Sequence, residues 1–269
     1  MRQENHSQLL QFVESMSGCQ MLSQMLRAED FTGVALDRRY DPILDIATDE
    51  GFKVFRIAQR RLMPHCLAWW GIECKTWVWM CRATYGRTKD VPLGNQALKQ
   101  VEEANTVMGR FTFLALVLWF GLRLFIVEQP ASSLLNSAQP IDILFEVTSA
   151  KLVRVDHGYY DLPDAPVKPL KLMGTAPWLQ KMNKAIKMKP YGQRAKLCDK
   201  KRKLMPDGTW CLKFTGKKGE MSESEHYCAG FARELAHRHK CWFNNGQPFI
   251  HQALPARPSG GSSFLHATH

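Results

Sequence analysis

The sequence predicts an α/β protein in which a mostly parallel sheet carries helices on both faces and a small basic region follows it. Short apolar runs alternate with longer segments of helical periodicity between residues 9 and 133, the order that parallel strands and crossover helices require. One run, Leu122–Val127, is almost continuously apolar, as in a strand buried on both faces. We expect an α/β domain over residues 1–165, a basic region over 166–246 and a disordered Pro/Ser/Gly-rich tail over 247–269.

The first apolar run, residues 9–13, is followed by a turn of small residues and by a helix expected over residues 19–27. Ser17 and Gly18 form the turn, and Glu14 precedes it. Such a turn lets backbone N–H groups approach a ligand closely, and a helix N-terminus favours negative charge. It is therefore a candidate binding loop, although one glycine falls far short of a full Gly-x-Gly-x-x-Gly motif.

The second apolar run, residues 32–36, ends at Asp37, about 20 residues after the turn. At this spacing an acidic residue can reach the ribose hydroxyls of a bound nucleoside. Asp37 is equally consistent with a helix or turn cap. The pattern by itself leaves both roles open.

A third strand is expected at residues 66–70, after a helix over residues 51–62 that begins near Thr48 and is ended by Pro64. Cys74 follows just past this strand, beside a lysine. A partly exposed thiol next to a cation has a lowered pKa and is a candidate nucleophile. The alternative is a buried, unreactive cysteine.

The fourth strand is expected to end at Glu128, because Pro130 stops the apolar run. A polar loop with Arg82 and Arg87 and a long helix over residues 96–120 lead to it. The carboxyl ends of parallel strands line the crevice where open α/β sheets bind ligands, so Glu128 is a candidate functional carboxylate with a shifted pKa. The alternative is a strand-end carboxylate that faces water or caps a turn.

These residues resemble the cytosine-C5 DNA methyltransferases, S-adenosylmethionine-dependent enzymes built on a Rossmann-like sheet. Glu14–Gly18 stands where that family has an acidic residue followed by a small-residue and glycine pair. Gly71–Trp77 stands where it has its Pro-Cys-x-x-Phe-Ser nucleophile loop, and Val127–Pro130 where it has Glu-Asn-Val. The resemblance covers residues 9–133 and, more faintly, an approach to a strand at residues 165–169.

The resemblance implies a mechanism and a set of roles. Cys74 as a thiolate would add to C6 of a flipped-out cytosine while Glu128 donates a hydrogen bond to N3, which lets C5 take a methyl group. S-adenosylmethionine would place its ribose at Asp37 and its adenine amino group near Asp45. The residues implied at the cofactor are Glu14, Ser17, Gly18, Asp37 and Asp45. The implied substrate is nucleic acid, with DNA favoured over RNA.

The chain also departs from the family pattern. Glu73 replaces the proline before the nucleophile, and its negative charge raises the pKa of a neighbouring thiol, whereas Lys75 acts in the opposite direction. Met16 stands where the family has an aromatic residue. Two other functions therefore stay open: a catalytically inactive Rossmann-like module that binds nucleic acid through its basic region, and a small-molecule methyltransferase with a closed apolar pocket.

The segment 168–218 is rich in Lys and Arg, which alternate with aromatic residues. Basic groups neutralise phosphates and aromatic rings stack on bases, and the segment lies where the related enzymes have their target-recognition insert. A solvated charged appendage is the alternative. The run Lys200–Lys203 is typical of a nuclear address or a phosphate-binding patch. The candidate nucleic-acid contacts are Arg82, Arg87, Lys200, Lys201, Arg202 and Lys203.

A hairpin is expected around Asp207–Gly208 and a terminal helix over residues 222–239, capped by Ser222 or Ser224. Cysteines and histidines recur in this region and raise the question of zinc. Their spacing matches no common zinc motif, so no metal is expected from the sequence. They are Cys198, Cys211, Cys228, Cys241, His226, His237 and His239.

The net charge of +11 favours an anionic partner such as nucleic acid. The most apolar window, residues 111–122, is shorter than the roughly 20 residues needed to span a bilayer, so no membrane partner is expected. The eight cysteines are scattered singly, which indicates a reducing, intracellular location, nuclear or cytoplasmic. No obligate protein partner is indicated.

Overall fold

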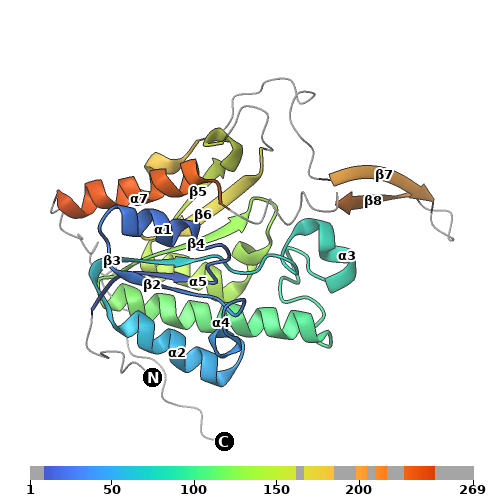
Figure 1. The fold of residues 1–269 in the computed structure, drawn as a ribbon. Helices are drawn as coiled ribbons and strands as arrows, with labels where there is room; N and C mark the ends of the chain where they lie inside the picture. Colours follow the sequence, from blue (N-terminus) through green and yellow to red (C-terminus); the bar gives the residue numbers. More distant parts are fainter. Residues whose placement is uncertain (1–8, 162–166, 185–197, 205–209, 217–226, 246–269) are drawn as a thin grey trace, which may run out of the picture.

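The computed structural model describes residues 9–161, 167–184, 198–204, 210–216 and 227–245. These residues form one large sheet with helices on both faces and a separate two-stranded ribbon (Figure 1). The predicted α/β class with a mostly parallel sheet is therefore confirmed. The strands are β1 (Leu10–Ser15), β2 (Gly33–Leu36), β3 (Leu62–Trp70), β4 (Leu124–Pro130), β5 (Lys151–Asp156), β6 (Pro169–Gly174), β7 (Cys198–Leu204) and β8 (Trp210–Gly216).

The large sheet has the strand order β2-β1-β3-β4-β6-β5. β1 to β4 pair in parallel, whereas β6 runs antiparallel to both β4 and β5. After β1 the chain goes to one edge to form β2 and then returns to the other side of β1 to form β3 and β4. The strand order thus reverses between β1 and β3, and ligands of open α/β sheets bind outside the carboxyl ends of strands at such a point.

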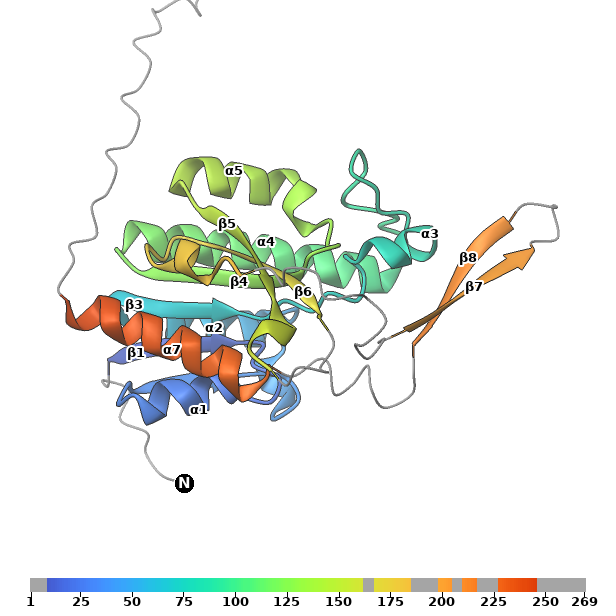
Figure 2. The ribbon, with the colours of Figure 1, turned by 90° about the horizontal axis from the view of Figure 1, so that it is seen from above.

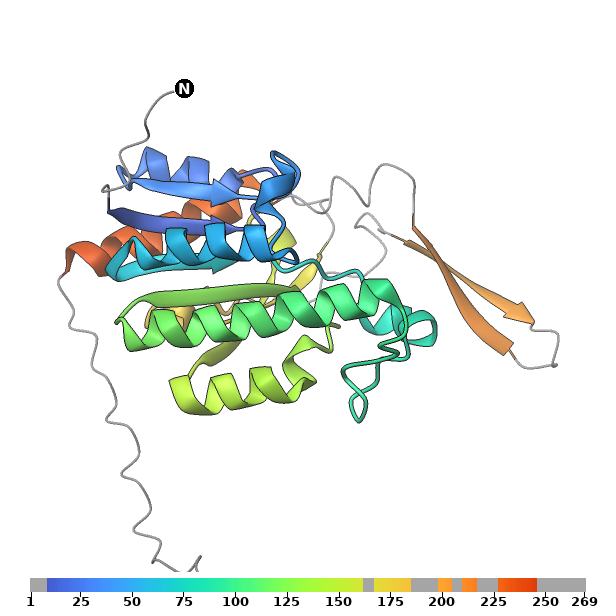
Figure 3. The same cartoon turned by 90° about the horizontal axis from the view of Figure 1, so that it is seen from below.

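The longer helices of the described residues cover both faces of the sheet (Figures 2 and 3), and their side chains contribute to a different core on each face. We call the two faces the α7 face, with α1 (Met21–Ala28) and α7 (Ala229–Asn244), and the α4 face, with α2 (Asp49–Arg60), α4 (Lys99–Phe120) and α5 (Gln139–Thr148). The short connecting helices are η1 (Pro42–Leu44), η2 (Trp79–Cys81), α3 (Arg82–Tyr85), η3 (Leu135–Ser137), η4 (His157–Tyr159) and η5 (Leu179–Met182).

Alternate strand residues build a separate apolar core on each face. Phe12 and Trp69 belong to the core of the α7 face, whereas Val13 and Trp70 belong to that of the α4 face. This follows from the two-residue period of a strand, in which successive side chains point to opposite faces. On the α4 face, Trp70 packs edge-on against Phe111 with ring centroids 5.2 Å apart. Both faces of the parallel strands are buried, which accounts for their nearly continuous apolar sequences.

The strand β4 extends beyond its predicted end. Its parallel pairing with β3 stops at Val127, but Glu128 and Gln129 continue in antiparallel pairing with β6, as far as Pro130. Glu128 is therefore not the last residue of the strand. Pro130 is tolerated because one side of β4 is already unpaired at this point, so its missing N–H group is not needed there.

The boundary between α2 and β3 also differs from the prediction. Thr48 caps α2 as expected, because its hydroxyl accepts a hydrogen bond of 3.0 Å from the Gly51 N–H. The helix ends earlier than predicted, however, and Pro64 lies within β3 instead of stopping the helix. Next to it His65 has a φ of 64°, and the pairing of β3 with β1 shifts register near this point. An irregular first half of β3 thus accommodates the proline.

The α/β domain is not confined to residues 1–165. β6 lies between β4 and β5, and α7 packs beside α1. β7 and β8 form the expected antiparallel hairpin and stand apart from the large sheet in Figure 1. The helix α7 begins at Ala229, and the predicted helix start at residue 222 lies outside the described residues.

Several expectations fall outside the described residues: the hairpin turn at 207–208, the caps Ser222 and Ser224, and the tail 247–269. Among the residues that are described, no helix is both long enough and apolar enough to cross a bilayer.

Candidate active site at the carboxyl edge of the sheet

The turn after β1 has an unusual backbone. Met16, Gly18 and Gln20 all have positive φ values, of 56°, 54° and 58°. Glycine adopts this conformation without strain, whereas the other two need support from their surroundings. Part of this support comes from β2, because the N–H groups of Met16 and Ser17 both donate to the Leu36 carbonyl, at 2.7 and 3.2 Å. The turn is thereby fixed to the carboxyl end of β2.

Glu14 is fully buried and caps α1 from the neighbouring strand. Its Oε2 accepts hydrogen bonds from the Ser23 N–H at 2.7 Å and from the Ser23 hydroxyl at 2.5 Å. The residue at the N-cap, Gln20, offers no side-chain cap, so the carboxylate takes over this task. Burial raises the pKa of Glu14 to about 7, and the hydrogen bonds from Ser23 only partly oppose this.

Two buried polar atoms near the turn have no hydrogen-bond partner among the described residues. They are the Glu14 Oε1 and the Ser17 hydroxyl oxygen. Unpaired buried polar atoms are costly and are usually satisfied by protein, water or a ligand. Glu14 and Ser17, two of the predicted cofactor-binding residues, thus each have a side-chain oxygen that could bind a cofactor.

Asp37 holds the turn together. Its Oδ2 accepts a hydrogen bond of 2.8 Å from the Gly18 N–H, and its Oδ1 accepts one of 2.8 Å from the Arg39 N–H. Of the two roles that the sequence left open, the turn cap is the one that the structure shows. A carboxylate has about four acceptor positions, so this role leaves some of them for a ligand.

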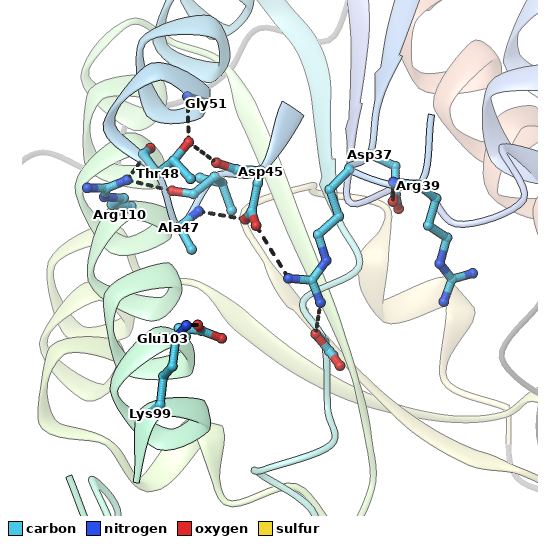
Figure 4. Close-up of polar contacts among 12 residues, drawn as sticks. Asp37, Arg39, Asp45, Ala47, Thr48, Gly51, Lys99, Glu103 and Arg110 are labelled. Carbon is cyan, nitrogen blue, oxygen red and sulfur yellow. Dashed lines mark hydrogen bonds and ion pairs between the residues drawn. The ribbon is translucent and has the colours of Figure 1, made fainter. Parts of the chain in front are cut away.

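Asp45, labelled in Figure 4, belongs to a chain of ion pairs that extends to Glu73, the residue before Cys74. It accepts a hydrogen bond from the Ala47 N–H at 3.0 Å and pairs with Arg38 at 3.5 Å. Arg38 also pairs with Glu73, at 2.8 Å. This guanidinium offsets the negative charge beside Cys74, so Glu73 opposes thiolate formation less than the sequence indicated.

Glu128 is at the end of a short hydrogen-bond chain. The Trp69 indole N–H donates to the Tyr227 hydroxyl at 3.2 Å, and this hydroxyl donates to Glu128 Oε2 at 3.0 Å. Burial raises the pKa of Glu128, and Lys168 and the hydrogen bond from Tyr227 partly oppose the rise. The pKa of Tyr227 is raised well above its ordinary value by burial and by the nearby carboxylate, so its hydroxyl keeps its proton.

Gly71, the residue after β3, leaves room for the Tyr227 hydroxyl. A Cβ atom on Gly71 would lie 2.9 Å from the Met16 carbonyl oxygen and 3.3 Å from the Tyr227 hydroxyl. Tyr227 was not predicted as a site residue. It is 99 residues away from Glu128 in the sequence, and no local pattern indicates that the two meet.

Cys74 is half-buried in a tight loop after β3. Its carbonyl accepts hydrogen bonds from the N–H groups of Trp77 and Val78, at 2.8 and 3.1 Å. Two residues earlier, the Ile72 carbonyl accepts a 2.5 Å hydrogen bond from the side chain of Gln129, the residue after Glu128. The structure therefore attaches the Cys74 loop to Gln129, the residue that follows Glu128 in β4.

Arg87, predicted to contact nucleic acid, has a structural role instead. Its side chain is fully buried, its guanidinium lies 3.5 Å from the Trp77 ring centroid, and it donates to the Pro92 carbonyl at 2.6 Å and to Asn105 Oδ1 at 3.0 Å. Burial lowers the pKa of Arg87 to about 10, so it remains a cation at neutral pH. It organises the loop that follows α3 and is not available to a phosphate.

Arg82 is exposed, as its predicted role requires. Its guanidinium lies 4.4 Å from the ring centroid of Trp79, a tryptophan that is 42% exposed. The remaining basic candidates are residues 200–203. The structure describes their backbone, which is part of β7. An aromatic and basic pair thus lies on the surface of the segment that follows Cys74.

No family model matches this chain, and no curated protein is significantly similar to it in sequence. Its function therefore has to be argued from the geometry and chemistry of the site.

Proposed function

We propose that the protein is an S-adenosylmethionine-dependent methyltransferase that acts on C5 of cytosine in nucleic acid, with DNA favoured over RNA. The observation that supports this most is the meeting of the Cys74 loop with the end of β4 next to Glu128, through the 2.5 Å bond from Gln129 to Ile72. A nucleophile and a carboxyl group at neighbouring strand ends are what the reaction needs, because the two act on one ring.

Glu128 would act as the hydrogen-bond donor to the ring nitrogen N3. Its raised pKa favours the protonated carboxyl, and a carboxyl kept neutral by burial can donate a hydrogen bond near pH 7. Because Tyr227 donates to Oε2, that oxygen is an acceptor, and the proton of Glu128 belongs on Oε1. Tyr227 is thus a positioning residue in this proposal.

Cys74 would act as the nucleophile. Its thiolate adds to C6 of the cytosine while Glu128 donates to N3, so that C5 becomes nucleophilic. Bound S-adenosylmethionine supplies the methyl group. Transfer of the C5 proton to solvent water would then expel the thiolate and restore the ring. The pairing of Arg38 with Glu73 at 2.8 Å offsets the negative charge that would otherwise oppose the thiolate.

The turn after β1 fits a cofactor that carries both donors and acceptors. Glu14 Oε1 and the Ser17 hydroxyl are buried without partners in the described part of the chain, and Asp37 has acceptor positions left. These residues would bind and orient the cofactor. They lie at the point where the strand order reverses, which is where open α/β sheets bind nucleotides.

Nucleic acid as the substrate is supported by charge and by surface chemistry. The net charge of +11 favours a polyanion. Arg82 stacked on the exposed Trp79 offers a cation and an aromatic ring close to the Cys74 loop, the combination that single-stranded nucleic acid binds.

The proposal is tested by trapping the covalent intermediate. A DNA oligonucleotide with fluorine on C5 of its cytosines prevents loss of the C5 proton, so the bond to Cys74 should persist in the presence of the cofactor. Wild-type protein should form a complex that resists denaturation, and Cys74→Ser should not. Cys81→Ser, which changes a half-buried cysteine in the same segment, is the matched control and should still be trapped. An RNA oligonucleotide of the same sequence tests the preference for DNA.

The second candidate is an inactive module that binds nucleic acid. It is favoured by the contacts that already occupy the site, namely Tyr227 on Glu128 and the two backbone N–H groups on Asp37. Calorimetric titration with S-adenosylmethionine distinguishes the two candidates. A folded protein that binds salt-sensitively to nucleic acid but shows no saturable heat with the cofactor would be this module.

A further inference from the structure

Three residue types that bind metals meet beside the start of α7, apart from the proposed catalytic residues. They are His157 in η4, Asp161 shortly after it, and Cys228 at the N-cap of α7. One ligand atom from each lies within 4.8 Å of the ligand atoms of the other two. Two segments about 70 residues apart in the sequence thus place a nitrogen, an oxygen and a sulfur ligand atom close together.

The imidazole of His157 is held in a defined orientation. The ring is buried, packs against Phe231 with centroids 5.3 Å apart, and its Nε2 accepts a 2.9 Å hydrogen bond from the backbone N–H of Cys228. Because Nε2 is an acceptor, the proton of the neutral ring is on Nδ1. The Nε2 lone pair points at the backbone N–H of Cys228, so a metal ion bound at Nε2 would replace this hydrogen bond.

We propose that His157, Asp161 and Cys228 form a binding site for one divalent transition metal ion of the zinc type, with water as a fourth ligand. Imidazole, thiolate and carboxylate are the ligands that Zn²⁺ uses in proteins, whereas Ca²⁺ and Mg²⁺ select oxygen ligands only. Ligand atoms of a tetrahedral zinc site lie roughly 3.3–3.8 Å apart, given bonds of about 2.0–2.3 Å. The ligand atoms of the cluster, which lie within 4.8 Å of one another, would have to approach by up to about 1.5 Å, and the exposed side chain of Asp161 can supply part of this movement.

The charges of the cluster suit a dication. A thiolate from Cys228 and the Asp161 carboxylate together offset two positive charges. Lys168 lies near enough to His157 to influence it and opposes a cation, but it also lies near the Glu128 carboxyl. The two anionic ligands therefore outweigh the one opposing cation.

The site would fix the start of α7 to the end of β5. Cys228 directly follows Tyr227, whose hydroxyl bonds to Glu128, so a metal ion at Cys228 would hold Tyr227 in place. This inference concerns metal binding and does not depend on methyl transfer.

The test is a titration of the full-length protein, freed of metal with a chelator, with Zn²⁺ in a calorimeter and with Co²⁺ in a spectrophotometer. One ion should bind per chain, and Co²⁺ should give the absorption of a thiolate complex. Loss of an outer-shell partner costs about 10–100-fold in metal affinity, so loss of a ligand in Cys228→Ser or Asp161→Asn should cost more than about 100-fold. Cys241→Ser, on the same helix, is the matched control.

Other outcomes would overturn the proposal. One is the absence of Zn²⁺ binding by a folded wild-type protein. Another is loss of binding in Cys241→Ser but not in Cys228→Ser, which would assign the ion to the Cys241 and His237 pair, 3.4 Å apart. Because Asp161 is exposed, Asp161→Asn should fold even if Cys228→Ser does not. Equal melting temperatures of Asp161→Asn and wild type without metal confirm that this variant reports on the ion alone.

Discussion

The two faces of the sheet differ in the buried polar side chains that they receive from the same strands, β1 and β4. Successive residues of β1 and β4 point to opposite faces, so Glu14 and Glu128 belong to the α7 face and Ser15 and Gln129 to the α4 face. On the α4 face, Ser15 accepts from Gln59 at 3.1 Å, and Gln129 bonds to Ile72 and accepts from Ser133. These groups are neutral and hydrogen-bond to one another or to the backbone, although Gln59 Oε1 has no partner among the described residues.

The α7 face carries buried groups that titrate. Burial shifts the pKa of each away from its ordinary value, and the shifts have opposite signs for acids and bases. The groups are Glu14, Glu128, His157, Tyr227 and His239. The α4 face thus contributes mainly apolar packing. The α7 face holds the buried titratable groups through which pH changes stability, and it also holds the proposed catalytic carboxyl group.

The largest effect is expected at His239. Its ring is fully buried, and neither ring nitrogen has a hydrogen-bond partner among the described residues. Burial lowers the pKa of His239 from 6.5 to about 3. Below pH 6.5 the unfolded chain therefore binds more protons than the folded protein, and the free energy of unfolding decreases as the pH is lowered. The full loss by pH 3 is about 5 kcal/mol, of which about 2 kcal/mol falls between pH 7 and 5. In urea unfolding, His239→Leu should reduce the loss between pH 7 and pH 5 by about 2 kcal/mol, and the loss from His157, whose pKa burial also lowers, should remain. An unchanged loss in the variant would place the acid sensitivity elsewhere.

The α4 face should respond to volume rather than to pH. Phe111 is fully buried and packs edge-on against Trp70 and Phe125. Phe111→Ala should lower the free energy of unfolding by about 3–5 kcal/mol, equally at pH 5 and pH 8. Phe113→Ala, at a position that is 51% exposed on the same helix, should cost much less. Equal losses in the two variants, measured by urea unfolding, would contradict the assignment of this core.

A smaller effect of opposite sign is expected at Glu14. Its pKa of about 7 in the folded protein exceeds the value of 4.5 in the unfolded chain. The stability that this contributes is therefore fully present below pH 4.5 and is lost as the pH rises through 7, by about 3 kcal/mol in total. Glu14→Gln should abolish this loss between pH 5 and pH 8. Glu29→Gln, at a residue paired with Lys240 near the surface, is a suitable control.

The smallest effect is expected at Tyr227. Its hydrogen bond lowers the pKa of Glu128, so Tyr227→Phe should raise that pKa further and cost about 1 kcal/mol of stability. Carbon NMR of the glutamate carboxyl groups during a pH titration would follow Glu128 directly. A lower pKa in the variant would mean that Tyr227 excludes solvent more than it stabilises the charged carboxylate.

Local patterns were enough to predict most of the parallel sheet. The apolar runs that became β1 to β4, the Thr48 cap of α2 and the hairpin of β7 and β8 all depend on neighbours in the sequence. Errors occurred where a distant partner decided the outcome. β4 continues past Glu128 because β6 pairs with it, and Pro64 lies in a strand because β1 and β4 accept an irregular β3.

The sequence by itself determined the α/β class, the turn at Ser17 and Gly18, and the places of Cys74 after β3 and of Glu128 in the last part of β4, because strand periodicity is a local property. Only the tertiary structure decided the environment of those residues. Tyr227 on Glu128, Arg38 on Glu73, the burial of Arg87 and the meeting of His157 with Cys228 all join segments far apart in the chain. Contacts of this kind depend on how helices pack on the sheet, and no spacing in the sequence encodes them.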